Sequence, residues 1–510
     1  MLYKSYCATC VGIDAVTVTV EVDMTPGVGV HLVGLPDSAV RESLLRVFTA
    51  LSSYGFSIPG RKIIVNLAPA DLRKEGSSYD LAIALGLIAI SGKIDLPHLE
   101  DFIVMGELAL DGHIRPVSGA LPTAIHAKEA GFRGCILPKE SALQAADIEG
   151  IAVYGADNLA QAIEILSGSG GHEELLVHPS PRATTPASFQ NDFKNVRGQA
   201  VAKRGFEIAA AGSHNLILVG PPGSGKTLMA SCLPSILPPM TRDESIETSK
   251  IYSIAGRSWG NPGLMATRPF RSPHHSASLA SLVGGGSAAS PGEISLAHNG
   301  VLYCDEIAQF PRSVLDALRQ PIEDGRVTIS RARYKVEYPS RFMLIASMNP
   351  CPCGFYGDGT GRCKCSRTAI DNYMSRVSGP VMDRMDMQIF CEKVSGDELI
   401  DAEENEPSGA IAARVVSARL VQEERFRREG IYTNSQMNVE QLGRYCAIGD
   451  AEKKFLKNVI ERLHLSARAY SRILKLSRTI ADLEGADRIT LQHISEAVQY
   501  RNLDRLPDPD

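Results

Sequence analysis

The stretch from Asn215 to Thr227 reads NLILVGPPGSGKT, an apolar run followed by the phosphate-binding pattern GxxxxGK(S/T). The apolar run predicts a buried strand, and the LMASCL that follows predicts a helix. Between a strand and a helix, glycines let backbone N–H groups point at phosphate oxygens, and the helix N-terminus adds positive potential. A chance glycine-rich turn does not explain these flanking elements. The stretch therefore predicts a nucleotide site on an α/β sheet.

Two acidic residues follow a second strand-like run. Gly300 to Glu306 reads GVLYCDE, and acids at this place are expected beside a phosphate-binding loop. Asp305 would join the Mg²⁺ shell and Glu306 would polarise the attacking water, which binding alone would not need. We therefore expect ATP hydrolysis. In the loop, Lys226 would hold the β and γ phosphates, Thr227 would ligate Mg²⁺, and the phosphates would be surrounded by Gly220, Pro221, Pro222, Gly223, Ser224 and Gly225.

Length and composition limit the class of protein. A chain of 510 residues is longer than one core needs and predicts two to four domains. The net charge of −5 gives no global attraction to nucleic acid, so DNA contacts would have to come from local basic patches. The apolar run Leu81–Ile90 is too short to cross a bilayer, and the opening MLYKSYCATC lacks a signal-peptide pattern. With 11 cysteines, an odd number, we expect a reduced, cytoplasmic protein without membrane contact.

Patterning predicts three structured regions and a linker. Val16–Val22 reads VTVTVEV, an alternation typical of a half-buried strand, and opens an α+β or α/β domain over residues 1–166. Residues 167–190 are rich in Gly, Ser, Pro and Thr and predict a linker. Residues 191–393 alternate strand-like and helical runs, as an α/β core with a parallel sheet does. Residues 394–510 lose the strand signal and predict a helical lid.

The order of five motifs carries a resemblance over nearly the whole chain. The motifs GPPGSGKT, LYCDEI, RFMLIASMNPCPCG, SGPVMDRMD and SARAYSRILKLSRTIADLEG together resemble the YifB/ComM group of magnesium-chelatase-like AAA+ ATPases. The resemblance implies a homohexameric ring that binds ATP and Mg²⁺ and acts on branched or single-stranded DNA, with branch migration during DNA uptake and recombination as its task. Two rivals stay open: a protein-remodelling or metal-inserting motor, as in true magnesium chelatases, and a Lon-like ATP-dependent protease.

The same resemblance implies three further catalytic residues. Asn349, at the tip of the strand-like run Met343–Asn349, falls at the sensor-1 position and would orient the attacking water. Arg384 falls where an arginine finger would sit, and a finger stabilises charge on the phosphoryl group bound by a neighbouring subunit. Arg468 resembles the sensor-2 arginine that reads the γ-phosphate and moves the lid. The alternative for each arginine is an ordinary surface side chain.

Two segments are candidates for DNA contact. Gly325–Arg341 (GRVTISRARYKVEYPSR) predicts a hairpin with a basic tip, which would neutralise phosphates of any sequence. A solvated hairpin tip fits the same pattern. Arg268–Gly286 (RPFRSPHHSASLASLVGGG) resembles the insert that this group projects toward the ring pore, and its adjacent histidines are expected to pack in the loop and not to bind metal. The residues predicted to contact DNA are Arg268, Arg271, Arg331 and Arg333.

A basic stripe on the lid has two interpretations. Arg468, Arg472, Lys475 and Arg478 recur at helical spacing and fall on one face of a predicted helix. Such a stripe is usually a solvated face, and Arg468 also has the nucleotide-sensing interpretation given above.

Four of the cysteines lie close together in sequence. Cys351 and Cys353, followed by Cys363 and Cys365, frame a glycine-rich loop. Four thiolates at this spacing can hold one Zn²⁺ tetrahedrally and so stabilise the loop. CxC pairs are less diagnostic than CxxC pairs, so free thiols are the alternative. A zinc ion held in this way would be structural, because four protein ligands leave no open position for catalysis.

Residues 70–133 resemble the proteolytic domain of Lon-type enzymes, with Ser78 at the position of the serine. Leu121 stands where the activating lysine would be, and leucine cannot take a proton. Asp80 replaces the glycine that closes the turn. We therefore expect a Lon-like domain without peptidase activity, used for assembly or substrate contact. Two lysines nearby in sequence do not match the motif, namely Lys74 and Lys128.

Overall fold

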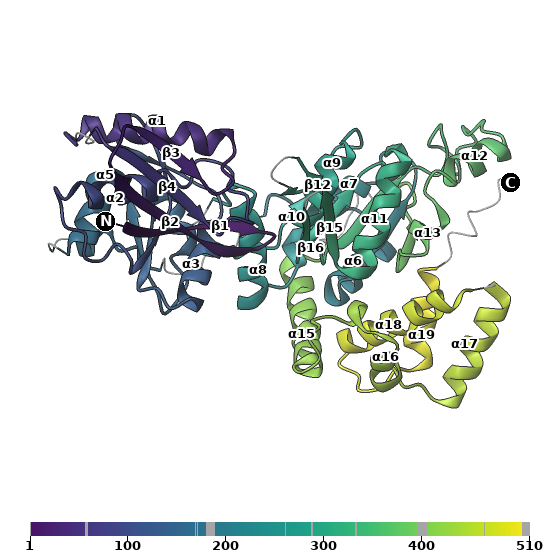
Figure 1. The fold of residues 1–510 in the computed structure, drawn as a ribbon. Coiled ribbons are helices and arrows are strands. Elements are labelled where there is room, and N and C mark those ends of the chain that lie inside the picture. Colours follow the sequence, from purple (N-terminus) through teal and green to yellow (C-terminus); the bar gives the residue numbers. More distant parts are fainter. Residues whose placement is uncertain are drawn as a thin grey trace.

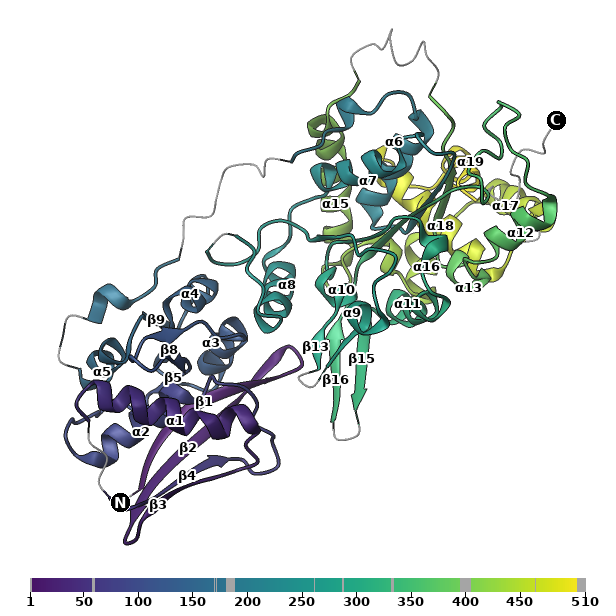
Figure 2. The same cartoon turned by 90° about the horizontal axis from the view of Figure 1, so that it is seen from above.

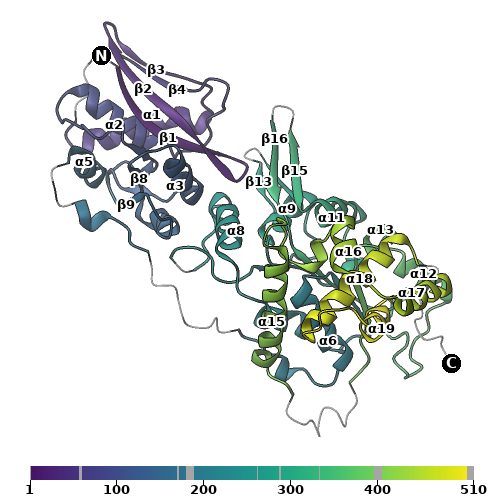
Figure 3. The same cartoon turned by 90° about the horizontal axis from the view of Figure 1, so that it is seen from below.

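The computed structural model describes residues 2–56, 60–168, 170, 172–179, 189–260, 262–286, 289–331, 334–394, 405–463 and 465–501. Its elements form an N-terminal α/β group, a second α/β group that we call the core, and a C-terminal group of helices that we call the lid (Figure 1). The lid helices lie beside the core, as Figure 3 shows. Within the described ranges, no helix combines the length and the apolar character that a bilayer crossing needs.

The N-terminal group is built on a seven-stranded mixed sheet in the order β3-β4-β2-β1-β5-β8-β9. Val18, Val20 and Val22 of the predicted alternating strand are fully buried on one face. Strand β1 is not predicted by the sequence pattern, because polar and apolar residues mix along it, yet it pairs with β2 over its whole length. The strands are β1 (Leu2–Val11), β2 (Asp14–Thr25), β3 (Gly29–Val33), β4 (Lys62–Ala68), β5 (Phe102–Val104), β8 (Gly134–Pro138) and β9 (Ala152–Ala156), with a separate ribbon of β6 (Glu107–Leu108) and β7 (Ile114–Arg115).

Two helices of this group follow the sequence closely. The first is capped by Asp37, whose carboxylate accepts from the Val40 N–H at 2.8 Å. The second contains the apolar run Leu81–Ile90 and is buried on nearly all sides, which explains an apolar run without helical periodicity. The helices are α1 (Ser38–Ser53), α2 (Asp80–Ser91), α3 (Ala120–Glu129), α4 (Lys139–Ala142) and α5 (Leu159–Ser167).

The N-terminal group extends further along the chain than predicted, so the linker begins later than residue 167. The Val177 N–H donates to the Val153 carbonyl of β9 at 2.8 Å. Residues 172–177 therefore pack on the N-terminal sheet, although their composition resembles that of a linker. The part of the linker from 180 to 188 lies outside the described residues.

The core holds a five-stranded sheet in the order β11-β14-β17-β10-β18, and all of its neighbouring strands are parallel. The carboxyl ends of all five strands therefore lie at one edge and their amino ends at the opposite edge. This division into a carboxyl edge and an amino edge decides where each candidate residue can act. The strands are β10 (Leu216–Val219), β11 (Phe270–Arg271), β14 (Val301–Cys304), β17 (Met343–Met348) and β18 (Met387–Phe390).

Helices and two small ribbons surround this sheet. The predicted hairpin exists as β15 (Arg326–Arg331) and β16 (Tyr334–Pro339), and Figure 2 shows it extending from the core beside the N-terminal group. A shorter ribbon pairs β12 (Gly284–Gly285) with β13 (Ser290–Pro291). The helices are α6 (Ala200–Gly212), α7 (Lys226–Cys232), α8 (Arg242–Ile254), α9 (Leu279–Val283), α10 (Glu293–Leu296), α11 (Arg312–Asp324), α12 (Arg367–Met374) and α13 (Gly379–Met382).

The lid shares a hydrophobic core with α6. Phe206 and Ile208 of α6 pack in one cluster with Phe426 and Ile480 of the lid, so the lid is docked on the α/β core and not merely tethered to it. The lid helices are α15 (Ser408–Phe426), α16 (Val439–Tyr445), α17 (Asp450–Leu463), α18 (Ala467–Leu483) and α19 (Leu491–Gln499). Short 3-10 turns complete the chain: η1 (Leu143–Ala145), η2 (His172–Leu175), η3 (Phe193–Asn195), η4 (Leu233–Ile236), η5 (Ile307–Gln309) and η6 (Asn434–Gln436).

Helix α8 joins the two α/β groups. The Ser253 carbonyl accepts from the Gly119 N–H at 2.9 Å, and the Ser253 hydroxyl accepts from the Leu121 N–H at 3.3 Å. Lys250 of the same helix lies 2.7 Å from the Asp14 carboxylate. The N-terminal group is therefore held against the core by contacts at the start of α3 and at the turn after β1.

Candidate active site

The glycine-rich loop after β10 has the backbone shape that the pattern predicts. Gly223 and Gly225 adopt φ angles of 82° and 84°, a region that disfavours residues with a Cβ. Gly220 packs closely on the chain beyond β18, since a Cβ at this position would lie 2.4 Å from the Cys391 carbonyl oxygen. Gln199, which the sequence analysis did not single out, donates to the Ser224 carbonyl at 3.2 Å. The loop is thus held from both sides at the carboxyl edge of the sheet.

Lys226 is folded over this loop. Its ammonium donates to the carbonyls of Gly220 and Pro221 at 2.7 and 2.8 Å, and it lies 3.5 Å from the Asn349 amide oxygen. Burial lowers the pKa of Lys226, while Asp305 and other nearby acidic groups oppose this effect. The structure therefore brings the predicted phosphate-binding lysine and the predicted sensor together at the end of β17.

Thr227 and Asp305 fit a shared Mg²⁺ ion. The Thr227 hydroxyl donates to the Asp305 carboxylate at 3.2 Å, and two neighbouring ligands of an octahedral Mg²⁺ lie about 3 Å apart. Ser347 of β17 also donates to the Asp305 carboxylate and fixes its orientation. The sequence analysis missed Ser347, because a serine inside an apolar strand carries no motif of its own.

Glu306 is held in an unusual backbone conformation next to Asp305. Its φ of 51° lies in the left-handed region, which costs a residue other than glycine about 1 to 3 kcal/mol. Hydrogen bonds from its N–H to Asp305 at 3.1 Å and to Ser347 at 3.3 Å hold this conformation. The side chain is 53% exposed, and His275 lies 4.0 Å away. This geometry leaves the carboxylate accessible to a water molecule beside bound phosphate.

The four-cysteine loop lies next to the phosphate-binding loop. The Cys351 sulfur lies 3.3 Å from that of Cys353 and 3.8 Å from that of Cys363. Burial opposes ionisation, but the Phe355 N–H and the neighbouring thiols lower the pKa of Cys353 to about 7. All four sulfurs, including Cys365, lie within 4.8 Å of one another.

The two predicted catalytic arginines lie at the amino edge of the sheet. The Arg384 carbonyl accepts from the Asn215 side chain at 3.1 Å, and Asn215 directly precedes β10. Arg384 and Arg468 converge on Glu323, at 2.6 and 3.7 Å from the same carboxylate oxygen. The four residues of β10, about 13 Å of strand, separate this edge from Lys226. Neither arginine is near the phosphate-binding loop of its own chain.

A cavity of about 710 Å³ opens between this amino edge and the lid. Glu323, Arg341 and Arg468 line it, together with Asp386 and Arg472. Burial alone would raise the pKa of the Asp386 carboxyl, but the Arg472 guanidinium and His214 hold it well below its usual range. The cavity is thus bordered by several cations and has one side formed by the lid.

The interpretation of the lid stripe as a solvated face is wrong for three of its four members. Arg472 and Arg478 are ion-paired with carboxylates that are themselves buried. The Lys475 ammonium donates to a backbone carbonyl at 2.7 Å. Only Arg468 of these four is largely exposed, at 61% of its side chain. Helical spacing reveals which face the residues share but not that the core and other parts of the lid cover this face.

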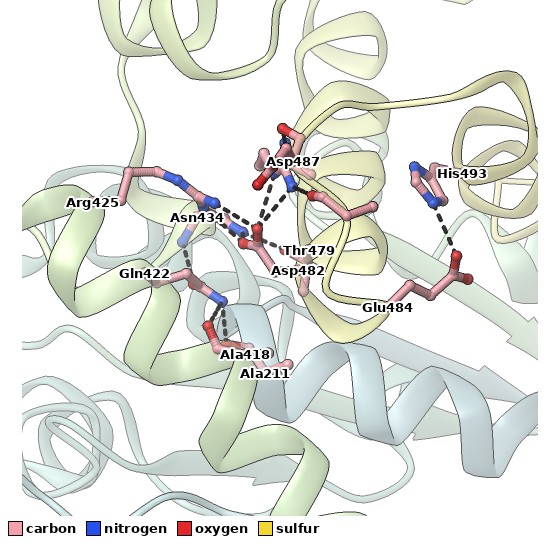
Figure 4. Close-up of polar contacts among 12 residues, drawn as sticks. Ala211, Ala418, Gln422, Arg425, Asn434, Thr479, Asp482, Glu484, Asp487 and His493 are labelled. Atoms are coloured by element: carbon pink, nitrogen blue, oxygen red, sulfur yellow. Dashed lines mark hydrogen bonds and ion pairs between the residues drawn. The ribbon is translucent and has the colours of Figure 1, made fainter.

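Buried polar contacts stiffen the lid around Asp482. Its carboxylate accepts from Arg425 at 2.7 Å and from Asn434 at 2.8 Å, so it connects α18 with α15 and η6 (Figure 4). Gln422 extends the network by donating to the Ala211 carbonyl of α6 at 3.0 Å. These hydrogen bonds tie the lid helices to one another and to the core.

Both arginines predicted for the pore insert are engaged within the protein. Arg268 donates to the Glu244 carboxylate at 2.7 Å and is 9% exposed. Arg271 donates to the Glu293 carboxylate at 2.6 Å and is 25% exposed. Their predicted contact with DNA therefore lacks a free guanidinium in this structure, because an acidic neighbour from the core occupies each one. The sequence pattern did not reveal these two acidic partners.

The hairpin presents exposed charges along its strands. Arg326 and Lys335 are 62% and 66% exposed, and both lie near Glu337, at 3.5 and 3.2 Å. Arg333 and the side chain of Arg331, the predicted tip, lie outside the described residues.

The residues around Ser78 in the Lon-like site are buried or engaged with other groups. Leu121, at the position of the lysine, is fully buried. Asp80 is buried and accepts from Arg46 at 2.8 Å, so the turn that carries Ser78 is locked by an ion pair. Lys74 is buried and its ammonium donates to a backbone carbonyl. Within the described residues, no hydrogen bond joins a lysine to the Ser78 hydroxyl.

The known families that match this chain divide it into the same three parts as the fold. The family described as magnesium chelatase, subunit ChlI, matches residues 192–399. A family described as subunit ChlI of Mg-chelatase matches residues 20–141, and one described as the ChlI C-terminal part matches residues 405–501. These matches cover parts of all three groups of the fold.

Individual relatives are similar over almost the whole chain. The chain is 42% identical to YifB of Salmonella typhimurium over 502 residues, which are 97% of this chain and 96% of that protein. It is 42% identical to the competence protein ComM of Haemophilus influenzae over 507 residues, 98% of this chain and 97% of that protein. A Lon protease of Azorhizobium caulinodans is 28% identical over 179 residues, 33% of this chain and 20% of that protein.

Proposed function

This chain belongs to the YifB/ComM group of magnesium-chelatase-like AAA+ ATPases, and we propose that it is a ring-forming motor that uses ATP hydrolysis to move DNA. Membership of this family supports ATPase activity with ATP and Mg²⁺. The residues we assign to the site are Lys226 for the phosphates, Thr227 and Asp305 for Mg²⁺, Glu306 for activating water, and Asn349 for orienting it.

The observation that carries the proposal is the separation of the catalytic groups across the sheet. Lys226 follows the carboxyl edge, whereas Arg384 and Arg468 lie at the amino edge. An arginine there can stabilise a transferring phosphoryl group only if the nucleotide belongs to a neighbouring subunit. A head-to-tail arrangement of copies places one edge against the other, and such an arrangement forms a ring when the rotation between successive copies closes. We propose a homohexamer.

The case for DNA rests on two observations. The β15–β16 hairpin projects from the core with exposed Arg326 and Lys335 and with Arg331 and Arg333 at its tip in sequence, and basic side chains bind phosphates without regard to sequence. A relative that is 42% identical over nearly the whole chain is called a competence protein. From these we propose branch migration of DNA during its uptake and recombination.

We also propose a structural zinc ion in the four-cysteine loop. Ligands at about 2.3 Å from a tetrahedral Zn²⁺ lie about 3.8 Å from one another, and the Cys351, Cys353 and Cys363 sulfurs are 3.3 to 3.8 Å apart. The loop also touches the nucleotide site, since a Cβ on Gly354 would lie 2.9 Å from the Pro222 ring. Zinc would therefore hold the segment that follows Asn349.

The test measures strand movement and ATP hydrolysis on the same preparation. The full chain, ATP and Mg²⁺ are mixed with a branched DNA substrate, and heteroduplex extension and ATPase rate are followed. We expect both for the wild type and neither for Lys226→Ala. Glu306→Gln should keep nucleotide binding and lose about 10²- to 10⁴-fold in hydrolysis.

Other outcomes identify the rival functions. An ATPase rate that does not change when DNA is added, together with no strand movement, contradicts the DNA motor. That result favours a protein-remodelling ATPase of the magnesium-chelatase type. ATP-dependent cleavage of casein that is lost in Ser78→Ala would instead establish a Lon-like protease.

A further inference from the structure

Glu323 occupies a place that helix stability does not explain. It lies in the last turn of α11, which ends with Glu323 and Asp324 and is closed by Gly325 at a φ of 63°. The C-terminal end of a helix carries negative partial charge, which disfavours carboxylates there. Asp324 has a local partner, because its carboxylate accepts from Gln320 at 3.1 Å. Glu323 is paired instead with Arg384 and Arg468 at the core–lid cavity, which both carboxylates line.

The Glu323 carboxylate meets both arginines of the amino edge. Arg384 lies 2.6 Å away, and its remaining terminal nitrogen donates to the Pro380 carbonyl at 2.6 Å. Arg468 lies 3.7 Å from the same Glu323 oxygen. One carboxylate, 42% exposed at its side chain, thus faces two cations from different parts of the chain, the segment before β18 and the lid helix α18.

Arg384 is folded inward by this contact. The residue is only 5% exposed, and its Nε is buried without a hydrogen-bond partner among the residues described here. A guanidinium in this position is too deeply placed to reach phosphate on another molecule. An unsatisfied buried donor is also costly, so the inward position is held against a penalty.

We infer that Glu323 is a restraining residue, which holds Arg384 inward and Arg468 nearby until the segment that carries it moves. Release exchanges one anion for another, because both guanidinium groups leave the Glu323 carboxylate and face the triphosphate of a neighbouring protomer. This inference rests on the proposed function. It adds a regulatory residue that touches neither ATP nor DNA.

The hairpin provides the means of release. It starts one residue after Gly325 and ends at Pro339, and the Ser340 N–H donates to the Gly325 carbonyl at 2.8 Å. Gly325 also packs against Arg341, because a Cβ at position 325 would lie 3.0 Å from the Arg341 side chain. Both ends of the hairpin are therefore fixed to the turn that follows Glu323. Displacement of the hairpin by bound DNA would move Glu323 relative to Arg384.

The test compares Glu323→Gln with wild type in steady-state ATPase assays over a range of protomer concentrations, with and without branched DNA. Because an ion pair with a half-exposed carboxylate is weak, we expect a basal kcat about two- to fivefold above wild type, with KM for ATP little changed and little further stimulation by DNA. Glu323→Asp keeps the charge, so its basal kcat should fall between those of wild type and Glu323→Gln. Asp324→Asn, the neighbouring carboxylate with its own partner, should match wild type.

Two controls exclude trivial explanations. Thermal unfolding should show Glu323→Gln folded at the assay temperature. The double variant Glu323→Gln, Arg384→Ala should be as slow as Arg384→Ala, because the gain depends on the released arginine. A Glu323→Gln rate as low as that of Arg384→Ala, or equal to that of Asp324→Asn, would overturn the inference.

The inference and the proposed function fail separately. If wild type is not stimulated by DNA while Glu323→Gln still raises the basal rate, the DNA motor fails and the restraint stands. If wild type is stimulated by DNA and Glu323→Gln behaves as wild type, the restraint fails and the motor stands.

Discussion

The guanidinium of Arg472 on lid helix α18 donates to the backbone carbonyl of Arg384 at 2.9 Å and is ion-paired with the buried carboxylate of Asp386. The Asp386 carboxylate also accepts from the Asn215 N–H at 2.9 Å, directly before β10. One lid residue therefore holds the segment of the proposed arginine finger and, through Asp386, the strand that leads to the phosphate-binding loop.

Arg472→Ala should loosen this junction. Removing one partner of a buried ion pair leaves the Asp386 carboxylate without its guanidinium, which typically costs about 3 to 5 kcal/mol. We expect a lower urea midpoint and a slower ATPase. The matched control is Arg427→Ala, since Arg427 is 72% exposed and its one ion pair among the described residues is with Glu424, at 3.0 Å. Equal urea midpoints for the two variants would contradict the role given to Arg472.

Asp386 should set part of the acid stability of the protein. Its folded pKa lies below the unfolded value of about 3.9, so its contribution is complete above pH about 4 and is lost as the pH falls further, toward the folded pKa. In urea titrations from pH 7 to pH 2, the free energy of unfolding of wild type should exceed that of Asp386→Asn. The difference should be constant above about pH 4 and shrink below it. A margin that is independent of pH would show that the charge of Asp386 is not involved.

Two inactive variants should restore one another if the site is shared between protomers. Lys226→Ala lacks a phosphate-binding lysine but keeps Arg384, whereas Arg384→Ala has the reverse defect. In a random equimolar mixture, about a quarter of the interfaces combine an intact Lys226 with an intact Arg384 from its neighbour. The mixture should therefore recover up to about a quarter of the wild-type ATPase rate per site. No recovery, in mixtures shown by size-exclusion chromatography to form joint oligomers, would argue against shared sites.

The four-cysteine loop predicts about one bound Zn²⁺ per protomer. Elemental analysis of protein purified without chelator should find it in wild type and not in Cys353→Ser. Because zinc would brace the segment after Asn349, its removal by a strong chelator should lower the melting temperature and the ATPase rate together. Cys10→Ser, at a partly buried cysteine of the N-terminal group, is the control that should keep the metal. Zinc-free wild type with full activity would leave the cysteines as free thiols.

The parts of the site that are contiguous in sequence could be predicted from sequence. The loop from Gly220 to Thr227, the acids at Asp305 and Glu306 and the β15–β16 hairpin all lie where their patterns indicate, because each is a local element with its own turn or strand signal. The buried helix at Leu81–Ile90 follows the same rule, since its apolar character is continuous.

The contacts between distant segments could not be predicted. Arg472 and Asp386 are 86 positions apart in sequence, and no local pattern indicates that one would neutralise the other. The sequence alone suggests that Arg268 is a free cation, because its partner Glu244 lies on helix α8 and is distant from it in the chain. Periodicity places Arg478 on a basic face, but whether that face meets water depends on the helices packed around it. A single sequence identifies the charged residues but not the residues that pair with them in the fold.

The contact between Ser253 and the start of α3 uses only main-chain donors of the N-terminal group, the N–H groups of Gly119 and Leu121. Main-chain donors are present whatever side chain the position carries. The two hydrogen bonds that align the N-terminal group with α8 therefore do not depend on the side chain at position 121, the position at which Lon-type enzymes carry their lysine.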